Sequence, residues 1–459
     1  MNLLESYAKR LSVAESVYSD RNSGAKLSNT KKIALATVLN NTEKFLNEAF
    51  TNSVGTQRAD MGAFKRFCLN LTTVTMPNLI ASELVIVHPM TSMAGYISYL
   101  KFVKGTNKGE SKRGDLVADP FKLGDVDVNY TSSLVVEEVE VGNAASEGDN
   151  SLTQLAWFPV FEGGKDEFGR DFGPSVVSPT EAQIKMEDAK AGLISISGVP
   201  EGTEVKIRYA YDNVVIPQND LPILNAEMAN IALVAKARRI AVYYSQLAAF
   251  QAKQDYGFDL GDQLAEKAVA ELSYEIDTEI TQLLIDNAAE DAKLRWNKAL
   301  PVGVSKADHY AGFAETIADA GRVIYDRTKK HMPTYMLVAS DIVPVLKFVP
   351  GFSAAPINSV NGPYYLGTVD GLKVFVTPNI AAGRFVVGVN GNDMMTSAAV
   401  YAPYMAIVPT QLLQYADGGT SQGFSTLYDL KLLNEALLVS GEIVNKPEEV
   451  VVNNKPING

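Results

Sequence analysis

The longest regular pattern in this sequence is a series of apolar side chains that recurs every four residues. The series follows Asp259, a residue type that accepts backbone hydrogen bonds at helix N-termini. Its members are Leu260, Leu264, Ala268, Leu272, Ile276, Ile280 and Leu284. A spacing of four lies close to the helical period of 3.6, so the apolar face drifts only slowly around the axis. We therefore predict one long helix from Asp259 to Leu284, the longest of the chain.

The residues before this helix predict helices first and strands afterwards. Apolar side chains at helical spacing predict two helices within residues 1–50, with a polar break between them and little core of their own. Strand-like runs begin at Leu71, and the apolar run ending at Val87 predicts a short buried strand. Lys104 to Asp115 is polar and rich in glycine, which is typical of a surface loop. Alternating runs then predict a β-rich region over residues 116–217.

The residues after the long helix predict a mixed α/β region. A helix is expected from Tyr310 to Lys329, and a short one opens at Ser340. The predicted strands are Tyr335 to Ala339, Leu372 to Thr377, Arg384 to Val389 and Ala398 to Tyr401, with further strands up to Val444.

Composition narrows the class of protein. The 459 residues allow about three domains, and 46% hydrophobic with 20% charged residues is typical of a folded chain. The net charge of −12, without a concentrated basic stripe, disfavours a nucleic-acid reader. Cys68 is the single cysteine, so an intramolecular disulfide and a thiolate zinc site are excluded. No apolar run approaches the roughly 20 residues that span a bilayer, and no secretory signal opens the chain, so we expect a soluble protein.

The search for catalytic chemistry finds little. His88, His309 and His331 stand without a second ligand at metal-binding spacing, and no phosphate loop, dinucleotide fingerprint or nucleophile elbow is present. Asp125 and Asp127 are the one candidate acid–base pair, although an alternating strand would place both on one solvent-facing side. We predict no catalytic residue, no cofactor and no metal.

One basic cluster stays open to two interpretations. Lys236, Arg238 and Arg239 lie between apolar residues. They either contact an acidic neighbouring subunit or form a solvated strand edge. From the residues alone, the chain is a large acidic α/β protein whose patterns favour assembly over catalysis.

Five blocks in this order resemble the major capsid proteins of T-even-type tailed bacteriophages. The most specific are MPNLIASELVIVHPMTSMAG from Met76 to Gly95 and VYAPYMAIVP from Val400 to Pro409. The others are FLNEA, DLGDQLAEKAVAELSYEID and QGFSTLY, and the region from Lys104 to Pro217 shows no such similarity. The resemblance implies an α+β fold, the Hong Kong phage-type capsid fold, with an N-terminal arm, an E-loop, a peripheral domain with a long spine helix, and an axial domain.

The resemblance also implies a domain division, which we state as an expectation. Residues 1–48 would be a helical pro-segment and 49–75 the N-terminal arm. The remaining parts would be 76–115 as the start of the peripheral domain and the E-loop, 116–217 as a β-rich insertion domain, 218–289 as the E-loop return and spine helix, 290–410 as the axial domain, and 411–459 as the peripheral return and tail.

In the family that the chain resembles, a prohead protease cleaves the shell protein after a Leu-x-Glu or Ile-x-Glu triplet. Leu46-Asn47-Glu48 before Ala49 is such a triplet, which implies cleavage between Glu48 and Ala49. Residues 1–48 carry a balance of +2, so their removal would leave −14 on the shell subunit and would repel DNA if that charge faced inward. For the E-loop, the resemblance implies intersubunit contacts by Lys104, Lys108, Lys112, Arg113 and Asp115.

The implied function is that of a structural major capsid protein, a homo-oligomer of hexamers and pentamers that forms an icosahedral shell around DNA. Its implied partners are a scaffold, the prohead protease, and vertex and decoration proteins, with no membrane. It would be assembled in the cytoplasm of the host bacterium and located in the virion. Three alternatives stay open: an encapsulin-like compartment, another virion structural protein such as a decoration or sheath protein, and an acidic hydrolase using Asp125 and Asp127.

Overall fold

The contacts in the computed structural model divide the chain into two units. One contains Met1–Ile97 and Asn230–Gly459, and the other contains Ser98–Ala229. The structure describes residues 3–21, 26–51, 58–107, 111–119, 121, 130, 134–142, 152–155, 158–163, 173–200, 203–212, 222–356, 362–391, 393–410 and 412–445.

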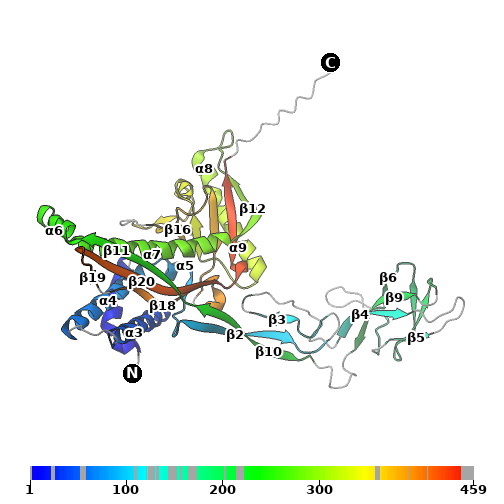
Figure 1. The fold of residues 1–459 in the computed structure, drawn as a ribbon. Helices are drawn as coiled ribbons and strands as arrows, with labels where there is room; N and C mark the ends of the chain where they lie inside the picture. The colour runs from blue at the N-terminus through cyan, green and yellow to red at the C-terminus, as the bar shows by residue number, and fades with distance from the viewer. Residues whose placement is uncertain are drawn as a thin grey trace, which may run out of the picture. The chain divides into compact units, whose positions relative to one another are not determined.

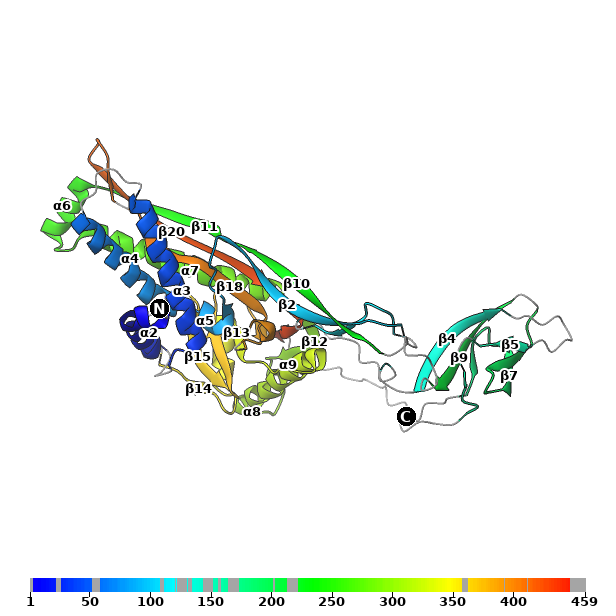
Figure 2. The same cartoon turned by 90° about the horizontal axis from the view of Figure 1, so that it is seen from below.

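The larger unit contains a seven-stranded mixed sheet, shown in Figures 1 and 2. In sheet order its strands are β12 (Ala289–Asn297), β21 (Leu438–Val444), β17 (Arg384–Gly388), β13 (Tyr335–Val338), β16 (Leu372–Val376), β15 (Tyr364–Val369) and β14 (Ser353–Ala354). Every residue of the central strand β13 is buried, because strands flank it on both edges and apolar side chains cover its faces. The strands predicted at Tyr335, Leu372 and Arg384 are therefore confirmed.

Several short helices and one amphipathic helix accompany this sheet. Helix α9 (Phe313–Thr328) packs against β12 and β21 and contributes Phe313, Ile317 and Ile324 to the main core. It confirms the predicted helix, which is interrupted at Gly312. The shorter elements are α8 (Lys306–Ala311), η3 (Ser340–Ile342), α10 (Val343–Leu346), η4 (Met394–Thr396) and η5 (Glu435–Leu437).

A second sheet has the order β1-β18-β20-β11, with β19 beside β20. Its strands are β1 (Ile86–Val87), β18 (Ala399–Pro409), β20 (Gly419–Leu432), β11 (Lys236–Ser245) and β19 (Leu413–Gln414). The predicted short strand at Ile86 is confirmed, and it pairs in parallel with Val400 and Tyr401 of β18. Strand β11 lies at the edge, which agrees with the strand-edge interpretation of the basic cluster. Arg238 reaches Glu279 at 2.6 Å and lies over the ring of Tyr428.

The predicted long helix is confirmed as α7 (Leu260–Asp286). The Asp259 carboxylate accepts hydrogen bonds from the backbone N–H groups of Gly261 and Asp262 at 2.9 and 3.4 Å, so it caps the helix as predicted. The apolar series is buried from Ala268 to Leu284, and α7 packs against β11, β20 and β18. A neighbouring helix, α6 (Gln246–Asp255), precedes it and buries only Ala252.

The strand-like prediction is wrong from Leu71 to Leu84, because this stretch forms the end of helix α4 (Arg58–Asn78) followed by α5 (Ala81–Leu84). Its β-branched threonines suggested a strand. In the structure the hydroxyl groups of Thr72 and Thr73 donate to the carbonyls of Cys68 and Leu69, four residues back, at 3.1 and 2.7 Å. These bonds satisfy the buried hydroxyls within the helix and remove the main objection to threonine there.

Three further helices occupy the N-terminus: α1 (Leu3–Ser6), α2 (Ala8–Arg21) and α3 (Asn29–Thr51). The two predicted helices are thus confirmed, and their small core is completed by α4. The buried residues of this core are Tyr7, Leu11, Ala14, Tyr18, Leu27, Leu35, Ala36, Leu39 and Leu69. Both α3 and α4 also pack against β18, so the first 48 residues are integrated with the larger unit.

The smaller unit is β-rich, as predicted. Its strands form two three-stranded sheets, β4-β9-β6 and β5-β8-β7, around a core that includes Ile194, Ile207 and Tyr209. Their bounds are β4 (Leu134–Gly142), β5 (Leu152–Gln154), β6 (Ser175–Ser178), β7 (Gln183–Asp188), β8 (Leu193–Ser197) and β9 (Glu204–Asp212). A further sheet, β10-β2-β3, is made of β10 (Leu224–Val234), β2 (Ala94–Lys104) and β3 (Leu116–Ala118).

Within the described ranges, no helix is both long and apolar enough to cross a bilayer.

Candidate functional site: a buried carboxylate beneath the N-terminal helices

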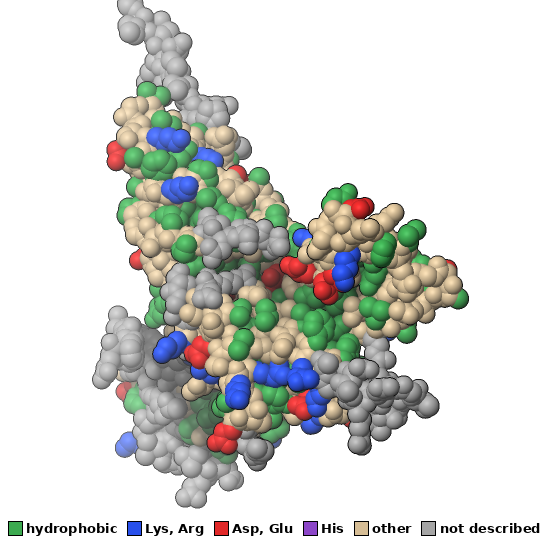
Figure 3. Space-filling model, turned by 90° about the vertical axis from the view of Figure 1, so that its left-hand side faces the viewer, with side chains coloured by type: hydrophobic (Ala, Val, Ile, Leu, Met, Phe, Trp, Pro, Cys, Tyr) green, Lys and Arg blue, Asp and Glu red, His purple; other side chains and the backbone are tan. Residues whose placement is uncertain are grey.

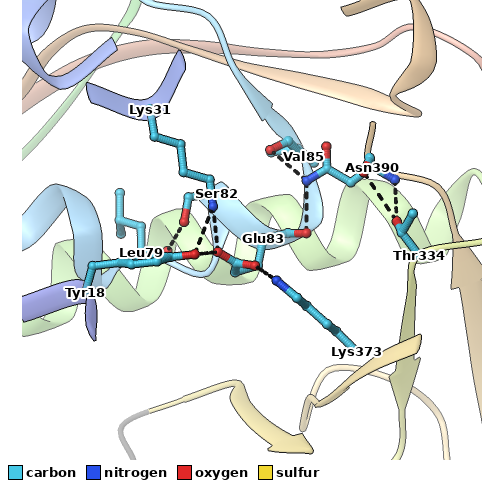
Figure 4. Close-up of polar contacts among 9 residues, drawn as sticks. All are labelled: Tyr18, Lys31, Leu79, Ser82, Glu83, Val85, Thr334, Lys373 and Asn390. Carbon is cyan, nitrogen blue, oxygen red and sulfur yellow. Dashed lines mark hydrogen bonds and ion pairs between the residues drawn. The ribbon is translucent and has the colours of Figure 1, made fainter. Parts of the chain in front are cut away.

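Glu83 is a buried ionisable residue of the larger unit. It lies in the one-turn helix α5, in the run from Leu79 to Val87, which is apolar apart from Ser82 and Glu83, and its side chain is only 7% exposed. A buried carboxylate is costly unless cations and hydrogen-bond donors compensate it. Figure 4 shows the groups that do so.

Side chains from the N-terminal helices α2 and α3 and from the distant strand β16 meet at this carboxylate. Lys31 of α3 approaches Oε1 at 2.6 Å, and the hydroxyl of Tyr18 in α2 donates to the same oxygen. Lys373 of β16 donates to Oε2. The Lys31 ammonium also donates to the Tyr18 hydroxyl at 3.1 Å. We call these four residues the Glu83 cluster; it links the N-terminal helices and the seven-stranded sheet through one side chain.

The backbone of α5 is held separately by Asn390. The Asn390 side-chain amide donates to the carbonyl of Glu83 at 2.9 Å and to that of Val85 at 3.4 Å. The backbone N–H of Asn390 donates in turn to the Thr334 hydroxyl at 2.7 Å. These bonds hold the backbone of the turn that carries Glu83.

Electrostatics make the cluster a charged one at neutral pH. Burial by itself raises the pKa of Glu83, but the ammonium groups of Lys31 and Lys373 outweigh it and lower the pKa from 4.5 to about 2. Glu83 therefore stays ionised and cannot serve as a proton donor near pH 7. A polar cavity of about 210 Å³ adjoins it, with Ser28, Thr30, Thr334 and Asn390 among its lining residues.

A second contact holds the far end of α3. The Asn41 amide donates to the carbonyls of Met90 and Tyr404 at 2.7 and 3.0 Å. Glu43 accepts from Lys65 of α4 at 2.6 Å and from the hydroxyl of Tyr7 at 2.5 Å. These two hydrogen bonds lower the pKa of the Glu43 carboxyl.

Leu46, predicted to be part of the cleavage triplet, lies in this second contact. It is 2% exposed and packs with Cys68 of α4 and with Met405 and Val408 of β18. We call these four residues the Leu46 cluster. The Glu48–Ala49 peptide bond follows within α3, which continues to Thr51. Burial raises the pKa of the Cys68 thiol to about 12, so this cysteine is an inert packing residue.

The predicted E-loop residues have different environments. Lys112 and Arg113 are exposed, while their backbone N–H groups donate to Asp115 and Asn107 at 2.6 and 2.7 Å. Lys104 is buried, and its ammonium donates to the Ser111 hydroxyl at 2.7 Å, so it shapes the loop from inside. Lys108 lies outside the described residues.

The other candidate groups form no catalytic arrangement among the described residues. Asp125 and Asp127 lie outside them. His309 bonds the carbonyl of Asn297 at 2.9 Å and stacks on Trp296. Within the same described ranges, no three His, Cys, Asp or Glu side chains gather as a metal site.

Sequence reasoning missed Glu83, Lys31 and Lys373. One signal was available: a single glutamate inside an apolar run must find a partner if the run is buried. The identity of that partner was not available, because Lys373 lies 290 residues away from Glu83.

The architecture described above is α+β, with the long helix α7 packed on the β1-β18-β20-β11 sheet and a β-rich second unit, and the comparison with family models assigns it to the capsid class of shell-forming structural proteins. The model of the family "Major capsid protein Gp23" matches residues 61–453, and the chain belongs to this family. It is a structural major capsid protein of a tailed phage and a component of the virion. Its mixture of helices and sheets agrees with the α+β class predicted above. A comparison with curated proteins finds no match.

Several solved structures are similar at low sequence identity. A chain of Mycobacterium phage Che8 is 15% identical, with 47% of this chain and 74% of that chain covered and a TM-score of 0.33. The SrpI encapsulin of Synechococcus elongatus is 12% identical, with 50% and 81% covered and a TM-score of 0.33. The capsid of Myoviridae phage XM1 is 8% identical, with 59% and 84% covered and a TM-score of 0.35.

Proposed function

We propose that this chain is the precursor of a shell subunit that assembles head to tail into hexamers and pentamers of an icosahedral head. The head encloses DNA without reading its sequence, and assembly takes place in the cytoplasm of the host bacterium. In such closed rings each contact is heterologous, so two different surfaces of the same chain must match.

The observation that best supports self-assembly is the exposed apolar side of α6. Its Leu247 and Phe250 are 68% and 64% exposed, and Tyr256 at its C-cap is 77% exposed. A ten-residue helix that buries only one alanine gains little from its own subunit. Figure 3 views the molecule from the side on which α6 lies and shows hydrophobic side chains exposed there. Aromatic side chains at this density are typical of protein interfaces.

The apolar surface extends beyond α6 onto the β19–β20 hairpin. The backbone N–H of Gln246 donates to the carbonyl of Gly418 at 2.9 Å, and the rings of Tyr243 and Tyr415 lie 6.1 Å apart. We propose that a second copy of this chain binds this apolar surface, because the family builds shells from many copies of one subunit. Asp259 and Asp262 add negative charge next to α6, so the same patch on another copy would be repelled and a different, basic surface is the match.

Two variants test these contacts. Phe250→Asp should reduce the fraction of subunits in rings, tubes or shells at least tenfold, because charge in an apolar contact is repeated at every subunit. Lys112→Glu with Arg113→Glu should reduce the assembled fraction in the same way, because it reverses the charge that the E-loop presents to a neighbouring subunit. The loop itself should stay folded, since its hydrogen bonds at these two residues come from the backbone. Sedimentation and negative-stain electron microscopy measure the assembled fraction, with Phe250→Tyr as the matched control. Normal shells from either variant would remove that surface from the proposal.

We also propose that residues 1–48 are a pro-segment that a prohead protease removes between Glu48 and Ala49. The support is the Leu-x-Glu triplet at Leu46 and the start of the family match at residue 61, beyond the proposed bond. A scaffold, the protease, and vertex and decoration proteins are the proposed partners.

The mass of the subunit in mature particles tests the cleavage. Mass spectrometry should find a chain that begins at Ala49, because the bond after Glu48 is the one broken. Peptides containing Met1 at full yield from mature virions would contradict it.

The nucleic-acid content of purified particles tests the proposal that the head encloses DNA. Particles that contain protein cargo in place of DNA would contradict it and would favour an encapsulin-like compartment.

A further inference from the structure

The proposed cleavage position lies in a helix, a conformation that does not fit a protease active site. Proteases bind their substrates as extended chain, and the Glu48–Ala49 bond is inside helix α3, which runs from Asn29 to Thr51. Several residues on each side of the bond must therefore leave the helix before it can be cut.

Unwinding this part of α3 breaks tertiary contacts as well as helical ones. Leu46 would leave the Leu46 cluster, in which Cys68, Met405 and Val408 are all buried. Asn47 would lose the hydrogen bond from Lys65 at 3.1 Å, and the same lysine holds Glu43. Leu46 is thus the most deeply buried residue of the Leu46-Asn47-Glu48 triplet.

We propose that the folded subunit shields its own processing site, and that the Glu48–Ala49 bond becomes cleavable only when residues 41–51 are released from α4 and β18. This inference rests on the proposed cleavage and adds its regulation. A free subunit is then cleaved only slowly even when a protease is present, and rapid cleavage reports that the α3 end has been displaced.

The test uses a glutamyl endopeptidase, which cuts after glutamate and does not require leucine two residues before it. The soluble full-length chain is digested under native conditions, and mass spectrometry follows the fragment that ends at Glu48. A synthetic peptide of residues 42–54 gives the rate for the unfolded segment. We expect the bond in the folded chain to be cut at least about 100-fold more slowly than in the peptide, since a buried leucine and a polar contact must first be released.

Variants locate the cause of the protection. Met405→Ala leaves the cleaved segment unchanged but removes its support, and should raise the cleavage rate about tenfold or more. Lys65→Met, which removes the ammonium that holds Glu43 and Asn47, should raise the cleavage rate severalfold. Ile33→Ala is the matched control, because it changes an exposed side chain of the same helix and should stay within about twofold of wild type.

The outcomes separate the two proposals. Cutting of the wild-type chain within about threefold of the peptide rate overturns the shielding, as does a Met405→Ala rate equal to that of Ile33→Ala. Mature virions that keep residues 1–48 would refute the cleavage itself and leave the measured protection standing.

Discussion

A chain made directly from Ala49 to Gly459 is expected to accumulate mainly in the insoluble fraction. The deletion removes the side chains that cover Leu69, Cys68 and Met405, all of which are buried in the full chain. Burial of each leucine-sized side chain contributes about 1.5–3 kcal/mol to the free energy of unfolding. Several such side chains together amount to a large part of an ordinary domain's stability. The measurements are soluble yield and, for any soluble fraction, the urea midpoint.

Co-expression of residues 1–48 as a separate chain provides the control. If non-covalent packing is the cause, the separate segment should restore solubility, because every contact described between it and the body is non-covalent. Equal urea midpoints for the truncated and complete chains would refute the idea that the N-terminal helices stabilise the subunit.

This result would give the N-terminal segment a role before any cleavage. The segment fills two cores of the body and neutralises Glu83 while the subunit folds. After its removal from an assembled shell, contacts with other copies would have to replace what it supplied.

The second large effect is expected at Glu83. Glu83→Gln should lower the free energy of unfolding of the N-terminal helices by about 2–3 kcal/mol at pH 7, because Lys31 and Lys373 lose the carboxylate between them. Hydrogen exchange of the amides of α3 and α5 measures this locally. Glu290→Gln is the control: its side chain is 77% exposed and pairs with Arg384 at the surface, so its loss should cost less than about 0.5 kcal/mol.

The same residue predicts a dependence on acid. The pKa of Glu83 in the folded state is about 2, below the ordinary value of 4.5 that a glutamate has in the unfolded chain. The unfolded state therefore binds more protons between these two pH values. The contribution of Glu83 is therefore complete above about pH 4.5 and is lost as the pH falls toward 2. The wild type should lose protection over this range more steeply than Glu83→Gln. Parallel curves for the two chains would show that the buried carboxylate does not couple to stability.

Local patterns were sufficient for several elements of the larger unit. Asp259 and the apolar series after it predicted α7 correctly, since a capping side chain and a repeat near 3.6 are properties of neighbouring residues. The error at α4 has an equally local cause. Thr72 and Thr73 favour strands by propensity, and the hydrogen bonds to their own helix that reverse this preference appear only once the helix is buried.

By itself, the sequence determined most helices and strands other than α4, the exclusion of an intramolecular disulfide, and the ordered blocks that resemble a capsid family. Only the tertiary structure decided that Glu83 joins Lys31 to Lys373 and that Leu46 lies buried beside Met405. The reason is physical: periodicity and capping act over a few residues, whereas a buried charge or a packed leucine depends on groups that the chain brings together from hundreds of residues away.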